Sequence, residues 1–327
     1  MLENIFSETI KEHNLIGKKD KIMLGVSGGP DSLALLYAFL SFKKKYKLKI
    51  VCLHFNHRLR QESDEEERFI RKICRDLDVE FISQKKKVNQ FRKDSLEQVA
   101  RNFRFDFFLK CSREKKIKKI ALAHHKDDLA ETVLMRMIRG TGLSGLRGFL
   151  PKAKFKNITI IRPFINLEKQ QILDWLKQKN ISFCLDKSNQ ETKFLRNKIR
   201  IELLPQLKAI NSAIVSRLSD LAANSGLDYD FIYNFSRNEF RRLRQKKAGR
   251  GLYLDLEGLQ GLHPAIFNNV VRIAIEQVKG NTRRIEQSHL TGVRKLILKG
   301  KNQASIHLPG IVIRKEKNVV FIQSLIL

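Results

Sequence analysis

A glycine-rich loop stands between two apolar runs near the start of the chain. The run 22–26 is typical of a strand, and the run that begins at Leu33 is typical of a helix. The loop consists of Ser27, Gly28, Gly29, Pro30, Asp31 and Ser32. Adjacent glycines allow a tight turn and a close ligand approach, and amides at a helix start attract anions. The loop therefore predicts a phosphate site, to which the hydroxyls of Ser27 and Ser32 add donors.

Asp31 is the unusual member of this predicted phosphate site. A carboxylate beside a phosphate repels it unless a cation bridges the two, so Asp31 predicts a bound Mg²⁺. Pro30 fits the first turn of a helix, where a missing N–H does no harm. The loop matches neither GxxxxGK[ST] nor GxGxxG. The plain alternative is a glycine turn between strand and helix that binds no ligand.

A second group of reactive side chains lies at 124–131, after the apolar run 120–123. Asp127 and Glu131 are four residues apart, so a helix places both carboxylates on one face. Asp128 and Glu131 are three apart and are able to pair instead. Such acids suit the binding of an amine or a metal, and the alternative is that they only stabilise the positive end of the helix. His124 and His125 just before them are either ligand-facing or structural.

Elements of two kinds alternate through the first half of the chain. Apolar runs predict strands at 22–26, 50–55, 79–82, 120–123 and 158–161, and the segments between predict helices at 32–41, 62–77, 95–113 and 127–139. Buried strands that alternate with helices indicate an α/β fold with a doubly wound parallel sheet. Ligands of such sheets bind beyond the carboxyl ends of the strands, where both groups above lie.

The pattern changes beyond about residue 205. Leu204-Pro205 is expected to end a helix, and helices are expected at 211–247, 264–279 and 285–299. Short strands are expected at 305–308, 311–314 and 319–322, with a Pro309-Gly310 turn. We therefore expect a catalytic domain at 1–210 and a smaller, mainly helical domain at 211–327.

The chain is strongly basic along its whole length. Its 327 residues include 64 Lys and Arg against 34 Asp and Glu, a net charge of +30, and the segment 216–327 contributes +10 of it. This balance predicts a polyanionic partner such as a nucleic acid, although a lysine-rich composition alone is the alternative. Four cysteines without a CxxC pair, no secretory leader and no long apolar stretch predict a reducing compartment and no membrane span. The expected location is the cytoplasm, with a plastid stroma as the alternative.

The sequence SGGPDS after an apolar strand resembles the PP-loop of the N-type ATP pyrophosphatases. That resemblance implies an adenine nucleotide alpha hydrolase-like fold and cleavage of ATP between its α and β phosphates, with AMP left on an acceptor. It also implies that ATP is bound by Ser27, Gly28, Gly29, Pro30, Asp31, Ser32 and His54.

Further segments are similar to the tRNA(Ile)-lysidine synthetase family: HFNHRLR, AHHKDDLAETVLMRMIRGTGLSGLRG, RPFINLEKQQILDWL, DKSNQETKFLRNKIRIELLP and LPGIVIRKE. The resemblance implies that free lysine is joined to C2 of the cytidine at position 34 of tRNA(Ile) with a CAU anticodon, through an adenylated intermediate. The product, lysidine, changes codon reading from AUG to AUA. Two departures are His125 where Asn is frequent and Leu129 where Gln is frequent, and the chain resembles a short form without an extra C-terminal domain.

The same resemblance assigns roles to individual residues. Asp31, Asp127 and Glu131 are the expected catalytic residues, with Asp31 on Mg²⁺ and the other two on the amines of lysine. Asp128 is the open alternative for lysine, and a homodimer is possible. Contacts to tRNA are expected from His57, Arg58, Arg139, Arg196, Asn197 and Arg200.

Two rival functions follow from other readings of the same residues. Another PP-loop tRNA-modifying enzyme of the thiolase type shares the loop, but the types that use iron–sulfur clusters need paired cysteines. A non-catalytic RNA-binding protein with a decayed loop is the other rival, against which the intact Ser27, Asp31 and Ser32 argue.

Overall fold

The structure is a computed structural model that describes residues 1–57, 63–86, 96–184, 195–245 and 251–325. The chain divides into two compact units, Met1–Asn224 and Ser225–Leu327. The division falls inside the long helix α10 (Ile214–Leu243). The two units are described separately below.

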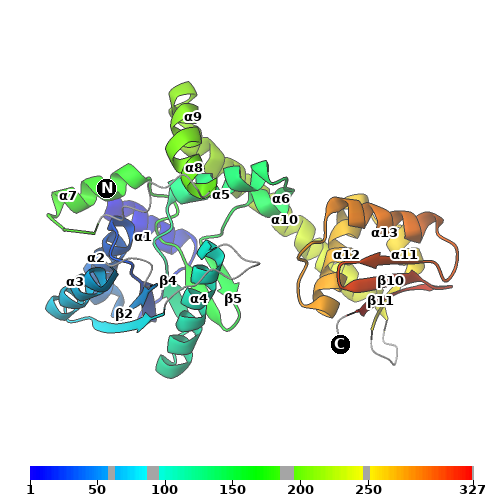
Figure 1. The fold of residues 1–327 in the computed structure, drawn as a ribbon, viewed down its shortest axis with the longest axis horizontal. Helices are drawn as coiled ribbons and strands as arrows, with labels where there is room; N and C mark the ends of the chain where they lie inside the picture. Colours follow the sequence, from blue (N-terminus) through cyan, green and yellow to red (C-terminus); the bar gives the residue numbers. More distant parts are fainter. Residues whose placement is uncertain (58–62, 87–95, 185–194, 246–250, 326–327) are drawn as a thin grey trace. The chain divides into compact units, whose positions relative to one another are not determined.

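Six strands form the central sheet of the first unit, in the order β3-β2-β1-β4-β6-β5. They are β1 (Lys21–Gly25), β2 (Lys49–Asn56), β3 (Glu80–Lys85), β4 (Lys119–Ala121), β5 (Lys152–Phe155) and β6 (Ile158–Ile161). All neighbouring strands are parallel except β5, which pairs antiparallel with β6 at one edge. The prediction of an α/β fold with a doubly wound parallel sheet is confirmed (Figure 1).

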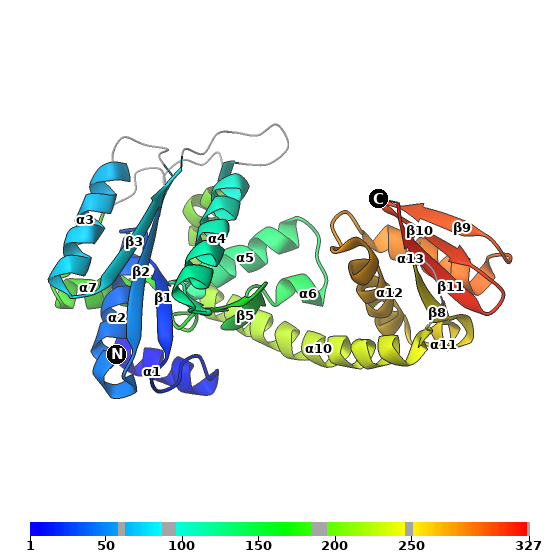
Figure 2. The same ribbon diagram turned by 90° about the horizontal axis from the view of Figure 1, so that it is seen from below.

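Both faces of this sheet are buried, which explains why its strands are apolar without alternation. Ile22 and Leu24 of β1 belong to one core, and Met23 belongs to the other. The first core is shared with α1 (Leu2–Glu12), α2 (Pro30–Tyr46), α3 (Ser63–Asp76) and α7 (Lys169–Gln178). The second is shared with α4 (Leu96–Lys115), which lies on the opposite face of the sheet (Figure 2).

Some elements of this unit, among them α1 and β5, were not predicted from the sequence. Helix α1 was not among the expected elements, although Leu2, Phe6 and Ile10 recur at the spacing of one helical face and are all buried. Strand β5 was also not expected. Its sequence, Lys-Ala-Lys-Phe, is mostly exposed, because an edge strand has little apolar surface to hide.

A group of helices completes the first unit. It consists of α5 (Lys126–Ile138), α6 (Leu143–Leu146), α8 (Leu195–Lys198), the π-helix η2 (Ile199–Leu203), α9 (Leu204–Ile210) and the start of α10. Leu129, Val133, Ile199 and Val215 form its core. The expectation that Leu204-Pro205 ends a helix is wrong. The chain stays helical through the π-turn, and Pro205 lies in the first turn of α9, where a missing N–H is harmless.

The second unit has its own core and an antiparallel sheet in the order β7-β8-β11-β10-β9. These strands are β7 (Arg244–Gln245), β8 (Leu252–Asp255), β9 (Ser305–Leu308), β10 (Ile311–Lys315) and β11 (Val319–Ser324), and the helices are α11 (Leu256–Gln260), α12 (Pro264–Lys279) and α13 (Gln287–Lys299). The three predicted strands after residue 304 are confirmed. In the part of the chain that the structure describes, no helix is long and apolar enough to cross a membrane.

Candidate active site

The glycine-rich loop joins β1 to α2 and is tied together by one hydroxyl group. Oγ of Ser32 accepts the backbone N–H of Ser27 at 3.1 Å and that of Gly28 at 3.2 Å, and it donates to the carbonyl of Gly29 at 3.0 Å. Ser32 is buried, so its hydroxyl orders the loop from inside. Helix α2 begins at Pro30, and the first amides of a helix have no acceptor within it. The loop therefore presents the positive end of α2 outward.

The backbone conformation and the neighbours of Gly28 both favour glycine at this position. Its φ of +92° lies in the region that side chains with a Cβ rarely adopt. A Cβ built there would also lie 3.3 Å from Cδ1 of Ile70 in α3. The carbonyl of Gly28 accepts the backbone N–H of Cys184 at 3.0 Å, which ties the loop to the segment after α7.

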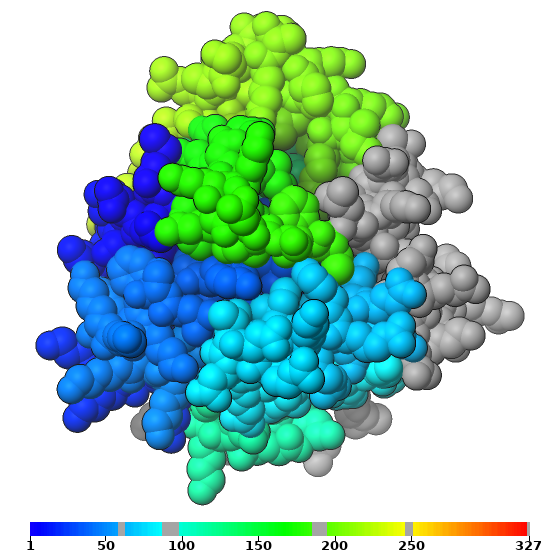
Figure 3. Space-filling view, turned by 90° about the vertical axis from the view of Figure 1, so that its left-hand side faces the viewer, coloured from blue at the N-terminus to red at the C-terminus, as the bar shows by residue number. Residues whose placement is uncertain are grey.

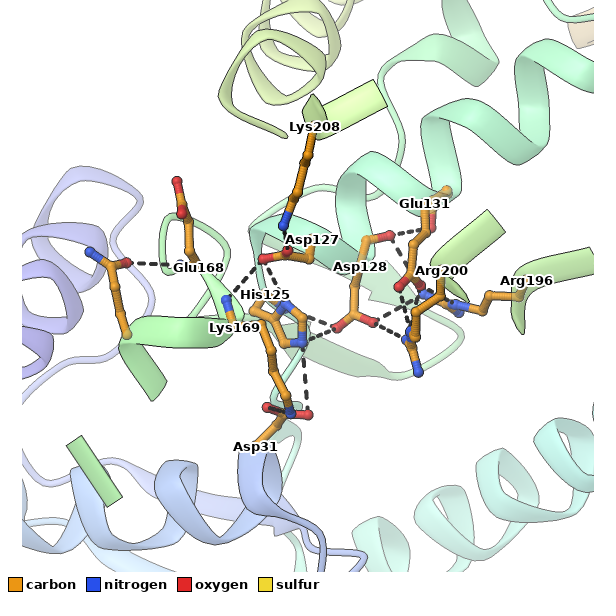
Figure 4. A network of polar contacts seen from close by, with 12 residues as sticks. Asp31, His125, Asp127, Asp128, Glu131, Glu168, Lys169, Arg196, Arg200 and Lys208 are labelled. Carbon is orange, nitrogen blue, oxygen red and sulfur yellow. Dashed lines mark hydrogen bonds and ion pairs between the residues drawn. The ribbon is translucent and has the colours of Figure 1, made fainter. Parts of the chain in front are cut away.

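Asp31 lies in the first turn of α2 and contacts two residues from other elements. Its Oδ1 accepts a hydrogen bond from Nζ of Lys169, the first residue of α7, at 2.5 Å. Its Oδ2 lies 3.7 Å from Nε2 of His125. The phosphate loop and the acidic helix α5, which are separate in the sequence, therefore meet at Asp31 (Figure 4).

His125 is the N-cap of α5 and lies among three carboxylates. Its ring nitrogens are 3.7 Å from Asp31, 3.7 Å from Asp127 and 3.4 Å from Asp128, and its side chain is 5% exposed. Its backbone N–H donates to Oδ2 of Asp128 at 3.1 Å, as in a capping box. His125 thus brings the predicted catalytic residues Asp31 and Asp127 to one point (Figure 4).

Asp127 is held by two different lysines. Its Oδ2 accepts the backbone N–H of Lys169 at 2.9 Å, and its Oδ1 accepts Nζ of Lys208 in α9 at 3.2 Å. The side chain of Lys208 is 45% exposed, whereas that of Asp127 is 12% exposed. A protein ammonium group therefore already occupies the carboxylate that was predicted to receive an amine.

Glu131 forms a compact ion-pair group with two arginines from the helices after residue 195. Nε of Arg196 donates to Oε2 at 2.8 Å, and Nε of Arg200 donates to Oε1 at 2.6 Å. The same arginines lie 3.3 and 3.4 Å from Oδ1 of Asp128. Glu131 is 1% exposed, so the two cations provide the charge compensation that a buried carboxylate requires.

Burial and neighbouring charges shift the pKa values of Asp128 and His124 in this site. Burial opposes the charge on Asp128, but His125, His124 and Arg196 outweigh it and lower the pKa of Asp128 to about 2. Burial lowers the pKa of His124 to about 3, and nearby arginines add to that effect against the opposing charge of Asp128. At neutral pH Asp128 is therefore ionised and His124 is neutral.

Two further predicted residues, His54 and His57, lie in strand β2 and directly after it. His54 is buried at the end of β2, where its Nδ1 lies 2.9 Å from the carbonyl of Val26 and burial lowers its pKa. Its Nε2 has no hydrogen-bond partner among the described residues. The ring of His57 contacts Phe55 edge-on, with the centroids 4.7 Å apart. Arg58 lies outside the described residues.

The remaining predicted tRNA contacts differ in exposure. Arg139 caps the C-terminal end of α5 and is exposed to solvent. Asn197 is half-buried in α8. Arg196 and Arg200 reach inward to Glu131, an arrangement that the basic run 196–200 does not reveal.

Sequence reasoning missed Lys169 and Lys208 entirely. Both contact predicted catalytic acids, Lys169 at Asp31 and Lys208 at Asp127. The segment RPFINLEKQQILDWL contained a signal for Lys169, because a lysine at the start of a helix opposes the helix dipole and needs another reason to be there. No comparable signal exists for Lys208, a single lysine on a basic chain.

The carboxylates of the site suit a metal ion that binds together with a nucleotide, rather than a metal ion that is held by the protein alone. Among the described residues, no group of three or more His, Cys, Asp or Glu side chains is arranged to hold a metal. Mg²⁺ typically uses one or two carboxylates together with substrate phosphates and water. Asp31 in the phosphate loop supplies such a carboxylate.

Comparison with known proteins shows the family and the fold of the chain. Residues 2–207 match the family description of a PP-loop domain, which uses ATP, and residues 254–321 match that of the TilS substrate binding domain. The U34-tRNA thiolase NcsA from Methanococcus maripaludis, solved with its 4Fe-4S cluster, superposes with a TM-score of 0.60 at 16% identity. That match covers 68% of this chain and 76% of the other. At that identity the likeness concerns the fold.

Two curated relatives extend over nearly the whole chain. The tRNA(Ile)-lysidine synthase of Clostridioides difficile (strain 630) is 34% identical over 319 residues, 95% of this chain and 68% of that protein. That of Caldanaerobacter subterraneus subsp. tengcongensis is 35% identical over 332 residues, 97% of this chain and 70% of that protein. With a PP-loop domain, a substrate-binding domain and these relatives, the chain belongs to the tRNA(Ile)-lysidine synthase family.

Proposed function

We propose that this protein joins free lysine to C2 of the cytidine at position 34 of tRNA(Ile) in two steps on one site. In the first step the C2 oxygen of the cytidine attacks the α phosphorus of ATP, and pyrophosphate leaves. In the second step the ε-amine of lysine attacks C2, and AMP leaves with that oxygen. The observation that carries this proposal is the junction at Asp31, where a phosphate loop meets a helix of carboxylates.

The first step is assigned to the loop Ser27–Ser32 and to His54. The amides at the start of α2 and the loop hydroxyls bind the phosphates of ATP, where they stabilise the charge that develops as pyrophosphate leaves. Asp31 is the proposed ligand for Mg²⁺, which when bound supplies positive charge to the phosphates. His54 is buried beside the loop, and its Nε2 has no partner in the described part of the chain, so His54 is proposed to contact the nucleotide.

The second step is assigned to the acids of α5. Lysine is a cation in solution, so carboxylates are natural receptors for its amines. Asp127 and Glu131 are the proposed receptors, with Asp128 as the alternative. Lys208 on Asp127 supports this role, because an ammonium group there is already accepted at 3.2 Å. An ammonium cannot attack C2, so one of these acids is proposed to take up the proton.

Binding of tRNA is assigned to the positive charge of both units. Exposed Arg139 lies at the C-terminal end of α5, away from the acids of its first turn. His57 and Arg58, which follow β2 in the sequence, are also proposed to contact tRNA. Arg196, Asn197 and Arg200 are proposed to position the tRNA near Asp128 and Glu131. An anticodon base is unpaired, which lowers the cost of bringing it into the site. A homodimer stays a prediction, which sedimentation of the full chain tests.

A thiolase has less support from the residues. The four cysteines are free thiols, of which Cys52, Cys74 and Cys111 are buried. Within the described ranges they belong to no group of three ligands of the kind that a cluster requires.

The direct test is release of pyrophosphate from ATP, with tRNA and lysine each omitted in turn. Full activity requires all three, and Asp31→Ala is expected to abolish pyrophosphate release while the circular dichroism spectrum is retained. Near-normal pyrophosphate release by folded Asp31→Ala protein contradicts the assignment of Asp31.

A further inference from the structure

Lys169 connects the phosphate loop to the acidic helix through two different groups. Its ammonium Nζ donates to Oδ1 of Asp31 at 2.5 Å, and its backbone N–H donates to Oδ2 of Asp127 at 2.9 Å. Lys169 is the first residue of α7, which packs against α2, so its main chain is fixed next to the loop. In Figure 3, α7 (green) and α2 (blue) lie side by side at the surface.

A structural role alone explains this ion pair poorly. The side chains of Lys169 and Asp31 are 34% and 30% exposed, and pairs at such exposure add little to stability. The main chain is held at Asp127, whereas the ammonium ends a flexible four-carbon stem. This combination of an anchored backbone and a movable charge suits a group that changes partner when a ligand binds.

The position of Asp31 indicates what that ligand is. Asp31 lies in the first turn of α2, where the helix start attracts phosphate, and its own charge opposes phosphate there. The ammonium of Lys169 pairs with the carboxylate of Asp31 and so balances its charge. Binding of ATP adds several negative charges at the same place, so the cation nearest to the loop gains a stronger set of acceptors.

We propose that Lys169 is a further catalytic residue, whose ammonium moves from Asp31 to the phosphate oxygens of ATP during adenylation. This inference rests on the proposed function of the site. As the C2 oxygen of the cytidine bonds to the α phosphorus, the bond from that phosphorus to the bridging oxygen breaks. Its electron pair leaves on pyrophosphate. Lys169 keeps its proton throughout and neutralises the growing negative charge.

The competing explanation is that Lys169 only shields Asp31. The two explanations predict opposite changes in Lys169→Gln, which removes the charge but keeps a polar side chain. If Lys169 contacts phosphate, the variant loses affinity for ATP. If it only shields Asp31, the variant frees that carboxylate, so Mg²⁺ binds more tightly and affinity for ATP with Mg²⁺ stays the same or rises.

The test is calorimetric titration of the full chain with ATP, AMP and pyrophosphate, each in EDTA and in Mg²⁺. Lys169→Gln is expected to weaken ATP binding about 10- to 100-fold, as for loss of one hydrogen bond to a charged group. Lys169→Arg keeps the charge and recovers most of that affinity. Lys177→Gln, an exposed lysine of the same helix, is the matched control and binds ATP like the wild type.

The AMP and pyrophosphate titrations identify the phosphate involved. A matching loss for AMP supports contact with the α phosphate, and a loss confined to ATP and pyrophosphate supports contact with the leaving group. Wild-type ATP affinity in Lys169→Gln overturns the proposal.

Kinetics separate this inference from the proposed function. Lys169→Gln is expected to form adenylated tRNA slowly, with an unchanged KM for lysine. If the wild-type chain adenylates tRNA and Lys169→Gln does so at the same rate, only the role of Lys169 fails. If the wild-type chain releases no pyrophosphate with tRNA present, the proposed function fails.

Discussion

The guanidinium of Arg200 holds the carboxylate of Glu131 through two hydrogen bonds, 2.6 Å from Nε to Oε1 and 3.0 Å from a terminal nitrogen to Oε2. Burial works against the charge on Arg200, but the bond to Glu131 outweighs it and raises the pKa of the guanidinium. Arg196 adds a third bond, to Oε2 at 2.8 Å. Any ligand amine that binds Glu131 must therefore share it with two arginines or displace them.

Glu131→Gln is expected to separate the two steps of the reaction. The amide keeps the shape of the side chain but removes the charge that both arginines need, so we expect a loss of about 1–3 kcal/mol in unfolding free energy. If Glu131 receives lysine, the variant still adenylates tRNA, but the second step needs a lysine concentration at least roughly tenfold higher. Accumulation of adenylated tRNA against lysine concentration measures this.

Three further variants show whether the change in lysine requirement is specific to Glu131. Asp127→Asn and Asp128→Asn test the other two acids of the same helix, and Glu114→Gln changes an exposed acid on α4. A Glu131→Gln enzyme that is less stable but has an unchanged lysine requirement rules out the receptor role of Glu131. The variant that does raise the lysine requirement then identifies the receptor.

Gly28→Ala is expected to destabilise the first unit, and Gly29→Ala is its matched control. At Gly28 the φ of +92° is costly for alanine and the new Cβ lies 3.3 Å from Ile70, so a loss of roughly 1–3 kcal/mol is expected. At Gly29 the φ is −73° and the new Cβ lies 3.7 Å from Ser27, an ordinary contact. Urea unfolding followed by the fluorescence of Trp175, the single tryptophan, measures both. Equal stabilities of the two variants contradict the account of the loop.

Stability is expected to fall as the pH drops through the titration range of His124. The unfolded chain binds a proton near the ordinary pKa of 6.5, while the folded chain leaves His124 neutral until about 3. Unfolding free energy therefore falls between pH 6.5 and 3, by up to about 1.4 kcal/mol per pH unit. Asp128, with a pKa of about 2 instead of 3.8, adds a second loss between pH 3.8 and 2.

His124→Asn removes the first of these losses. Urea unfolding at pH 4.5, 5.5, 6.5 and 7.5, values about 1 unit apart, gives the unfolding free energy at each pH. The slope of this free energy against pH is then compared between the variant and the wild type. His13→Asn, at a histidine next to the C-terminal end of α1, is the matched control. An identical pH dependence in His124→Asn and the wild type shows that His124 is not buried as a neutral group.

Affinity for tRNA is expected to fall steeply with salt, because a net charge of +30 predicts many phosphate contacts. Arg139→Ala is expected to weaken binding and to reduce the slope of log K against log salt by about 1. Arg113→Ala, at an exposed arginine in the last turn of α4, is the control. Equal affinities of the two variants at every salt concentration remove Arg139 from the tRNA surface.

The sequence was sufficient to predict the parallel strands of the sheet, because most of them are apolar runs buried on both faces. It did not predict the mostly exposed edge strand β5. It was also sufficient to predict a tight turn between β1 and α2, where Gly28 adopts a φ of +92°. The partners of Glu131 were not predictable, because Arg196 is 65 residues away in the chain and a basic helical run is equally suited to RNA. The same holds for Lys169, which meets Asp31 across 138 residues. Pairings of that kind depend on how helices pack, which no local pattern encodes.

The most direct test of the account is incorporation of labelled lysine into tRNA(Ile) by the full chain, measured together with pyrophosphate release. We predict one pyrophosphate for each lysine joined, lysine on the CAU-anticodon tRNA alone, and adenylated tRNA when lysine is left out. Pyrophosphate release that does not depend on tRNA, or adenylation that never leads to joined lysine, contradicts the account.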